Sequence, residues 1–134
     1  MMIDTREATE KDIELIYECR FHPDHVLMSL NKHIPSLDES RAYIIKNKML
    51  SEYRIIVSEF SKAVDCDIGY LQTKPDGSVH ISLLPTARGM GIGTRVLKQT
   101  TGWTYILDKN IGSIKAFEKA GYEKVGVLMK KVNK

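Results

Sequence analysis

A run of glycines in the second half of the chain is the strongest candidate for a binding site. Gly89, Gly91 and Gly93 lie within the segment Arg88–Thr94, between a predicted strand and a predicted helix. In such a turn the backbone N–H groups point outward and the helix dipole adds partial positive charge, which suits a pyrophosphate. Glycine has no Cβ to hold a phosphate away from these amides, and it tolerates positive φ values. The turn therefore predicts a diphosphate-binding site.

Two familiar nucleotide-binding motifs do not fit this turn. It lacks the Gly-Lys-Ser/Thr ending of a P-loop, and Val96 stands where a dinucleotide-binding motif has its last glycine. Both ATP hydrolysis and hydride transfer are therefore disfavoured. The alternative that stays open is a glycine-rich turn that only joins a strand to a helix.

His80 is the first candidate for a general base. Alternation along the predicted strand places Ser78, His80 and Ser82 on one face. An imidazole there can take a proton from an alkyl amine, which is almost fully protonated at pH 7. A histidine that is only hydrogen-bonded within a polar patch is the alternative. Glu59 and Glu52 are the other candidate bases, although each can equally be a solvated carboxylate.

The polar stretch 20–36 is expected to be a loop with one helical turn that recognises the acceptor. Its Arg20, His25 and Asn31 suit an anionic or polyhydroxylated molecule, although surface solvation is the alternative for each. His22 and His25 have no third ligand at metal-binding spacing, so no metal site is predicted.

The elements that must position these residues follow from hydrophobic periodicity and helix caps. Strands are expected at 2–8, 53–60, 67–73, 78–84, 103–107 and 122–129, and helices at 10–20, 37–50, 94–99 and 113–120. The order βααβββαβαβ predicts an α/β (α+β) fold with a central mixed, mostly antiparallel sheet flanked by helices.

Length and composition limit the architecture and the partners. The 134 residues are enough for one domain, expected to span 1–134, and a content of 43% hydrophobic and 28% charged residues disfavours disorder. A net charge of +3 is weak support for nucleic-acid binding. No apolar run approaches the roughly 18 residues of a membrane helix, and the first residues do not read as a signal peptide. We therefore expect a cytoplasmic protein with no membrane or nucleic-acid partner.

Two segments resemble the signatures of the GNAT superfamily of N-acetyltransferases. Leu83–Gly93 is similar to its acetyl-CoA motif, Gln/Arg-x-x-Gly-x-Gly/Ala, and Asn110–Tyr122 is similar to its second signature, an Asn followed by a helix and a Gly-aromatic exit. The resemblance implies that main-chain groups near Leu83 pair with the pantetheine arm and that amides of the turn hold the pyrophosphate. The implied cofactor-binding residues are Leu83, Leu84, Arg88, Gly89, Met90, Gly91, Ile92, Gly93, Thr94, Asn110, Ser113 and Phe117.

Two features depart from the superfamily pattern. Phe117 stands where many members have a tyrosine that protonates the departing thiolate. Loss of this general acid should slow the reaction without preventing it, and Tyr105, Tyr122 or a water could substitute. The helix after the turn is also expected to be short, which leaves this region either less stable or covered by another subunit, with a homodimer as one option.

The resemblance predicts an N-acetyltransferase that moves acetyl from acetyl-CoA directly to a primary amine of a small molecule. The amino-acid sequences of segments 81–85 and 110–117 resemble those of members that acetylate nucleotide-linked amino sugars. The alternatives are a non-catalytic CoA-binding module, suggested by Phe117, and a protein- or peptide-directed acetyltransferase.

Overall fold

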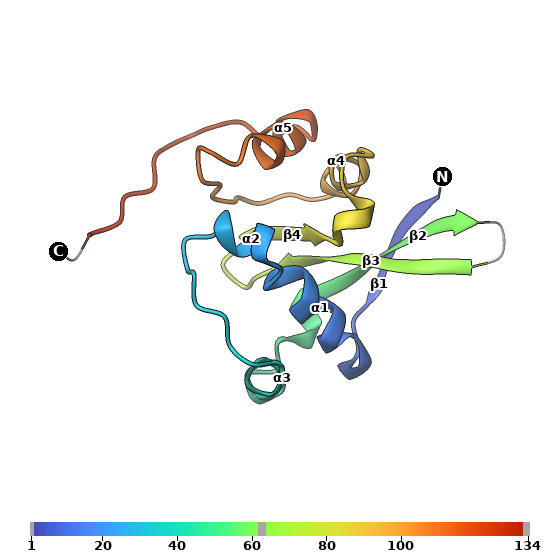
Figure 1. Cartoon of the computed structure of the whole chain (residues 1–134). Coiled ribbons are helices and arrows are strands. Elements are labelled where there is room, and N and C mark those ends of the chain that lie inside the picture. The colour runs from blue at the N-terminus through green and yellow to red at the C-terminus, as the bar shows by residue number, and fades with distance from the viewer. Residues whose placement is uncertain (1, 62–63, 133–134) are drawn as a thin grey trace.

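The computed structural model describes residues 2–61 and 64–132 and contains one sheet between two helical layers. The strands are β1 (Ile3–Glu7), β2 (Tyr53–Ser61), β3 (Val64–Thr73) and β4 (Val79–Leu83), and the helices are α1 (Ile13–Arg20), α2 (Pro23–Leu27), α3 (Leu37–Lys46), α4 (Ile92–Leu97) and α5 (Ile111–Lys119). The strands lie in the order β1-β2-β3-β4, and each neighbouring pair is antiparallel (Figure 1). The predicted α/β fold class is confirmed.

Local sequence explains where the helices begin. The Ser36 hydroxyl accepts from Glu39 N–H at 3.1 Å, in a capping box that starts α3. Asn110 caps α5 in the same way, because its Oδ1 accepts from Ser113 N–H at 3.3 Å. The helical turn expected within 20–36 is α2.

Two apolar clusters fill the spaces on either side of the sheet. One joins α1 and α3 to the sheet through residues such as Ile16, Ile44 and Tyr70. The other joins α4 and α5 to the opposite face through residues such as Ile56 and Leu97. Both clusters arise from period-2 alternation in the strands and apolar stripes on the helices.

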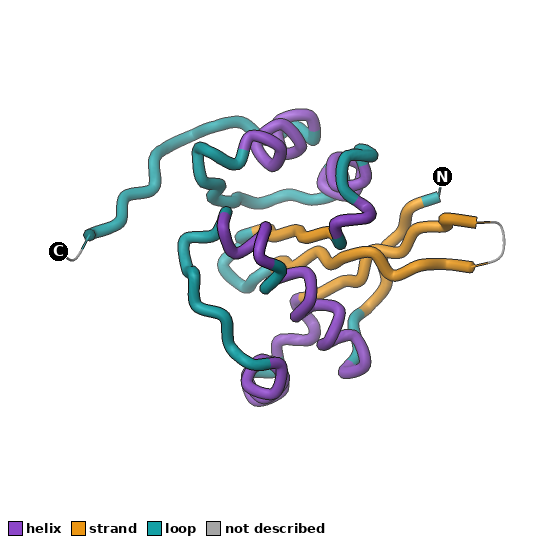
Figure 2. Tube along the Cα trace, in the orientation of Figure 1, coloured by secondary structure: helices purple, strands orange, loops and turns teal. Residues whose placement is uncertain are grey.

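The strand predicted at 103–107 is not formed. In the described residues the segment forms a single parallel bridge, between Trp103 and Ser78 just before β4, and the rest of the segment lies beside β4 as a loop (Figure 2). The chain reaches β4 through Gly102, which has φ 132° and where an added Cβ would lie 2.2 Å from Gly77 O. The two chain segments therefore come this close at Gly77 and Gly102, just before β4 begins.

The strand predicted at 122–129 is also wrong. The segment is extended but belongs to no sheet, and Figure 1 shows it leading away from the sheet after α5. Its apolar side chains are exposed, with Val125 at 89% and Met129 at 86%. A strand needs a hydrogen-bonded neighbour to be stable, and 103–107 does not supply one.

No helix in the described ranges is long and apolar enough to cross a membrane.

Candidate active site

The outer edge of β4 is open over its second half. Val79 N–H donates to Trp103 O at 2.8 Å, and within the described residues no backbone hydrogen bond joins β4 to the next segment beyond this point. Alternate residues of a strand turn their backbone groups to the same edge. Ile81 and Leu83 therefore present N–H and C=O groups to the edge that Val79 uses. Within the described residues these groups have no backbone partner on that edge.

The glycine turn follows directly from this open edge. Gly89 and Gly91 have φ values of 78° and 74°, and Gly91 is the N-cap of α4. A Cβ built on either residue would meet no atom within 4 Å, so a side chain at either position would enter open space. Gly93 instead packs against β4, because its Cβ position lies 3.9 Å from Ile81 Cδ1.

Arg88 lies across the open edge and connects it to α2. Its Nε donates to Leu83 O at 3.2 Å, and its Nη1 donates to Asp24 Oδ2 at 3.1 Å. An extended ligand that paired with Leu83 O would compete with the guanidinium for this carbonyl.

The structure brings two predicted catalytic side chains together. The rings of His80 and Tyr105 meet edge to face, with centroids 5.9 Å apart. His80 Nε2 also lies 3.1 Å from Ser78 Oγ. Burial, followed by the nearby charges of Lys74 and Arg20, lowers the pKa of His80 to about 4. His80 is therefore neutral at pH 7 and has an imidazole nitrogen that can accept a proton.

Helix α2 brings a second imidazole to the same face of β4. His25 Nδ1 lies 3.1 Å from Ser82 Oγ. Burial, followed by Arg20 and Arg88, lowers the pKa of His25 to about 4 as well. Arg20 is half-buried at the end of α1, close enough to influence both imidazoles. Two of the residues predicted to contact the acceptor, Arg20 and His25, thus lie close enough to His80 to lower its pKa.

Asn31 is not part of this cluster. Its side chain is exposed, and its Oδ1 accepts from His33 N–H at 3.0 Å, which stabilises a turn in the loop after α2. The described residues contain no group of three His, Cys, Asp or Glu side chains placed to hold a metal ion.

Glu59 lies far from His80 along the sheet. His80 is paired with Gln72, which is paired with Tyr53 at the start of β2, whereas Glu59 is paired with Asp65 toward the other end of that strand. At about 3.3 Å per residue, Tyr53 and Glu59 are about 20 Å apart. The structure does not bring Glu59 to the imidazoles.

The second signature forms the start of α5 and part of the core. Phe117 is 5% exposed and packs edge to face on Tyr122, with ring centroids 4.9 Å apart. The Tyr122 hydroxyl is hydrogen-bonded to Thr100 Oγ1 at 2.6 Å. Of the two tyrosines considered as proton donors, Tyr105 is therefore the one beside His80.

Gln72 is a buried polar residue that sequence analysis missed. It is fully buried, its Nε2 donates to Glu52 Oε1 at 3.0 Å, and its Oε1 has no partner among the described residues. The sequence does contain a signal for this burial. Gln72 lies two positions after Tyr70 in the predicted strand, so its amide is on the same face as the tyrosine. Glu52, considered as a base, instead binds this amide.

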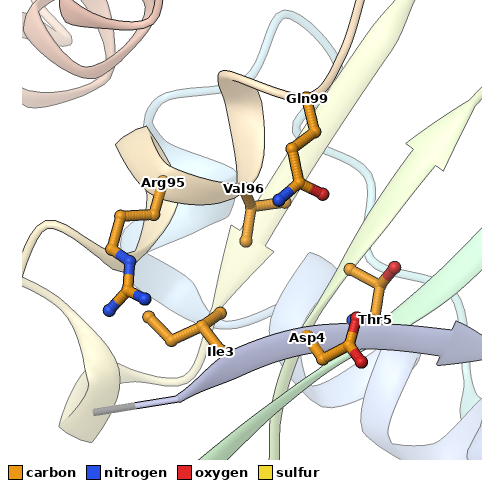
Figure 3. Close-up of a pocket in the computed structure, with 6 residues that line it drawn as sticks. All are labelled: Ile3, Asp4, Thr5, Arg95, Val96 and Gln99. Carbon is orange, nitrogen blue, oxygen red and sulfur yellow. The ribbon is translucent and has the colours of Figure 1, made fainter.

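A separate shallow hollow lies between β1 and α4 (Figure 3). Its lining contains none of the predicted site residues and consists of Ile3, Asp4, Thr5, Arg95, Val96 and Gln99. Because β1 and β4 are opposite edges of the sheet, we assign this hollow no part in the site around His80.

Comparison with known proteins supports the fold through structure rather than sequence. No protein-family pattern matches the chain, and no curated protein matches its sequence. The structure is similar to the aminoglycoside acetyltransferase AAC(6')-Ib solved with ribostamycin and coenzyme A, with a TM-score of 0.72 and 20% identity over 96% of this chain and 87% of that one.

Two further solved structures have the same architecture. Spermidine N-acetyltransferase from Vibrio cholerae, solved with CoA and spermine, gives a TM-score of 0.73 at 15% identity, covering 96% of this chain and 85% of its own. A GNAT-family acetyltransferase from Bacillus anthracis gives 0.72 at 14% identity, covering 94% and 82%. The chain therefore has the fold of GNAT-family acetyltransferases.

Proposed function

We propose that this chain is an acetyl-CoA-dependent N-acetyltransferase that moves acetyl directly to a primary amine of a small molecule. The open outer edge of β4, running into the glycine turn, carries the proposal. Ile81 and Leu83 offer main-chain groups to an extended pantetheine arm, and the amides at Gly89 and Gly91 border space for its diphosphate. The similar structures include acetyltransferases solved with coenzyme A.

The residues around this edge suit direct transfer. A neutral amine attacks the thioester, and an imidazole on this face, which the sequence predicts to be His80, takes the proton. Leu83 N–H faces the open edge and is suited to donate to the oxyanion. Tyr105, beside His80, is the proposed proton donor to the thiolate.

The contacts of α2 favour a small acceptor. His25 is hydrogen-bonded to Ser82 and Asp24 is paired with Arg88, so α2 covers the end of β4 and leaves less room for a peptide. The nucleotide-linked amino sugar stays our sequence-based proposal for the acceptor. The similar structures hold ribostamycin and spermine, so the panel below includes all three classes.

Calorimetry with acetyl-CoA, beside a thiol-release assay over a panel of amines, tests the function. We expect binding, and thiol release with at least one small amine. His80→Ala should leave the Kd for acetyl-CoA nearly unchanged while it slows turnover. Absence of acetyl-CoA binding would contradict the proposal.

The buried Phe117 supports one alternative, a non-catalytic CoA-binding module. That module would bind acetyl-CoA in the same calorimetry but release no thiol with any amine. The homodimer suggested by the short α4 is a separate prediction, which analytical ultracentrifugation tests.

A further inference from the structure

We propose that His25 is the catalytic base of this acetyl transfer and that Ser82 is the positioning residue that fixes its tautomer. The inference rests on the transferase function proposed above. It moves the proton-accepting role to a side chain that the sequence predicts only to contact the acceptor.

The carbonyl of Cys19, near the end of α1, has no donor within its own helix. In a continuing helix, Cys19 O would accept from the N–H of the residue four positions later, but that residue is Pro23, which has no N–H. Cys19 is fully buried, so its carbonyl needs another donor. Ser82 Oγ supplies it at 3.1 Å.

A serine hydroxyl has one hydrogen to donate, and this fixes the tautomer of His25. Because Ser82 donates that hydrogen to Cys19 O, its oxygen can only accept from His25 Nδ1, which lies 3.1 Å away. Neutral His25 therefore carries its proton on Nδ1 and its lone pair on Nε2. Within residues 2–61 and 64–132, no group is hydrogen-bonded to that Nε2.

His25 and His80 lie at different places along β4. Ser82 lies between Ile81 and Leu83, the residues that face the open edge, so His25 stands over the part of β4 where the thioester is proposed to lie. His80 follows Val79, whose N–H is still paired with Trp103. His25 is thus better placed to meet an amine that approaches the thioester.

Charged and titratable groups face His25 from several elements. These are Arg20 from α1, Arg88 from the glycine turn, and His22, next to Asp24 on α2, while His25 in turn affects the pKa of His80 on β4. Burial and the neighbouring cations lower the pKa of His25 to about 4, so it is in the proton-accepting form at pH 7.

The reaction step balances without another reagent. The amine nitrogen bonds to the thioester carbon as the C=O electron pair moves to oxygen, and one proton passes from nitrogen to His25 Nε2. The oxyanion then reforms the C=O bond and the C–S bond breaks. The thiolate takes a proton, with Tyr105 as the proposed donor; His25 then releases its proton to solvent, and the Tyr105 phenolate takes one back from solvent. The products are the acetamide and CoA thiol.

His25→Asn tests the inference with little change in shape. An asparagine amide nitrogen takes the place of Nδ1 and still donates to Ser82, but nothing replaces Nε2. We expect kcat to fall roughly 100-fold at pH 7, within the usual range for a general base. The KM for acetyl-CoA should stay unchanged, and the loss should shrink as pH rises because more of the amine is already neutral.

Three comparisons make the test decisive. Ser82→Ala should lower kcat about ten-fold and Ser82→Thr should restore it. The control is His33→Asn, in the loop after α2, which should change nothing. Nitrogen-15 NMR should show neutral His25 protonated on Nδ1 in the wild type. Retained turnover in His25→Asn, or an Nε2–H tautomer of His25, would overturn the inference. A wild-type chain that binds no acetyl-CoA or acetylates no amine would instead overturn the function beneath it.

Discussion

At Gly91, both the backbone conformation and the proposed ligand favour glycine. Its φ of 74° is unfavourable for a β-branched residue, although the space around it is open. We expect Gly91→Val to weaken acetyl-CoA binding by at least about 100-fold in calorimetry, because its side chain would fill the space proposed for the diphosphate. It should cost only about 1–2 kcal/mol in urea unfolding.

Gly121→Val is the matched control. Gly121 also has a positive φ, 104°, and open space at its Cβ position, but it follows the end of α5 and is not part of the glycine turn. It should lose similar stability and keep the wild-type Kd. Equal loss of affinity in both variants would show that strain, rather than the turn, governs binding.

Single residues of the site differ in how far the sequence reveals them. His80 follows from strand alternation and the glycine turn from composition, because both signals are local. The contact between His25 and Ser82 joins residues 57 positions apart, and the one between Ser82 and Cys19 joins residues 63 apart. Such contacts depend on how α1 and α2 pack on the sheet, which no local pattern encodes.

The ion pair between Asp24 and Arg88 connects helix α2 to the glycine turn. It is exposed, so it contributes about 0.2–1 kcal/mol. Asp24→Asn should release Arg88 from its place at Leu83 O and tighten acetyl-CoA binding, by at most about five-fold. Calorimetry at low and high salt measures this gain, which should disappear as salt screens the wild-type pair. Asp38→Asn, on the exposed start of α3, is the control, and weaker binding by Asp24→Asn would contradict the competition.

Elements with strong local signals match their predictions, and two without a partner do not. The helix at 37–50 carries a capping box and forms α3, followed by a short 3-10 turn. The segments 103–107 and 122–129 have strand-like composition, but each needs the other, or β4, as a hydrogen-bonded neighbour. On its outer edge, the backbone of β4 is hydrogen-bonded within the described residues only to Trp103, through Val79 N–H, so neither segment becomes a strand. Composition reports strand propensity but not the presence of an edge.

For the whole molecule, the two buried imidazoles predict how stability depends on pH. Both have a folded-state pKa of about 4, below the ordinary value of 6.5. Between these values the unfolded chain binds more protons, so the free energy of unfolding should fall as pH drops from about 6.5 to about 4. Melting temperatures across this range measure it, and the double variant His25→Asn/His80→Gln should give a flatter profile.

Asp12 contributes in a different pH window. Arg6 donates to it at 2.8 Å and lowers the pKa of its carboxyl below 3.8, so its stabilising effect should be lost only at still lower pH. A wild-type melting temperature that stayed constant from pH 6.5 to 4 would contradict the burial of the neutral imidazoles.

The incomplete pairing of β4 means that the ligand itself would act as the missing neighbour of the sheet. Amide hydrogens of Ile81 and Leu83 should exchange with deuterium quickly in the free protein and much more slowly when acetyl-CoA is bound, while those of Ser82 and Leu84, which face β3, should change little. Binding of the cofactor could then be followed, one amide at a time, as slower deuterium exchange along the outer edge of β4.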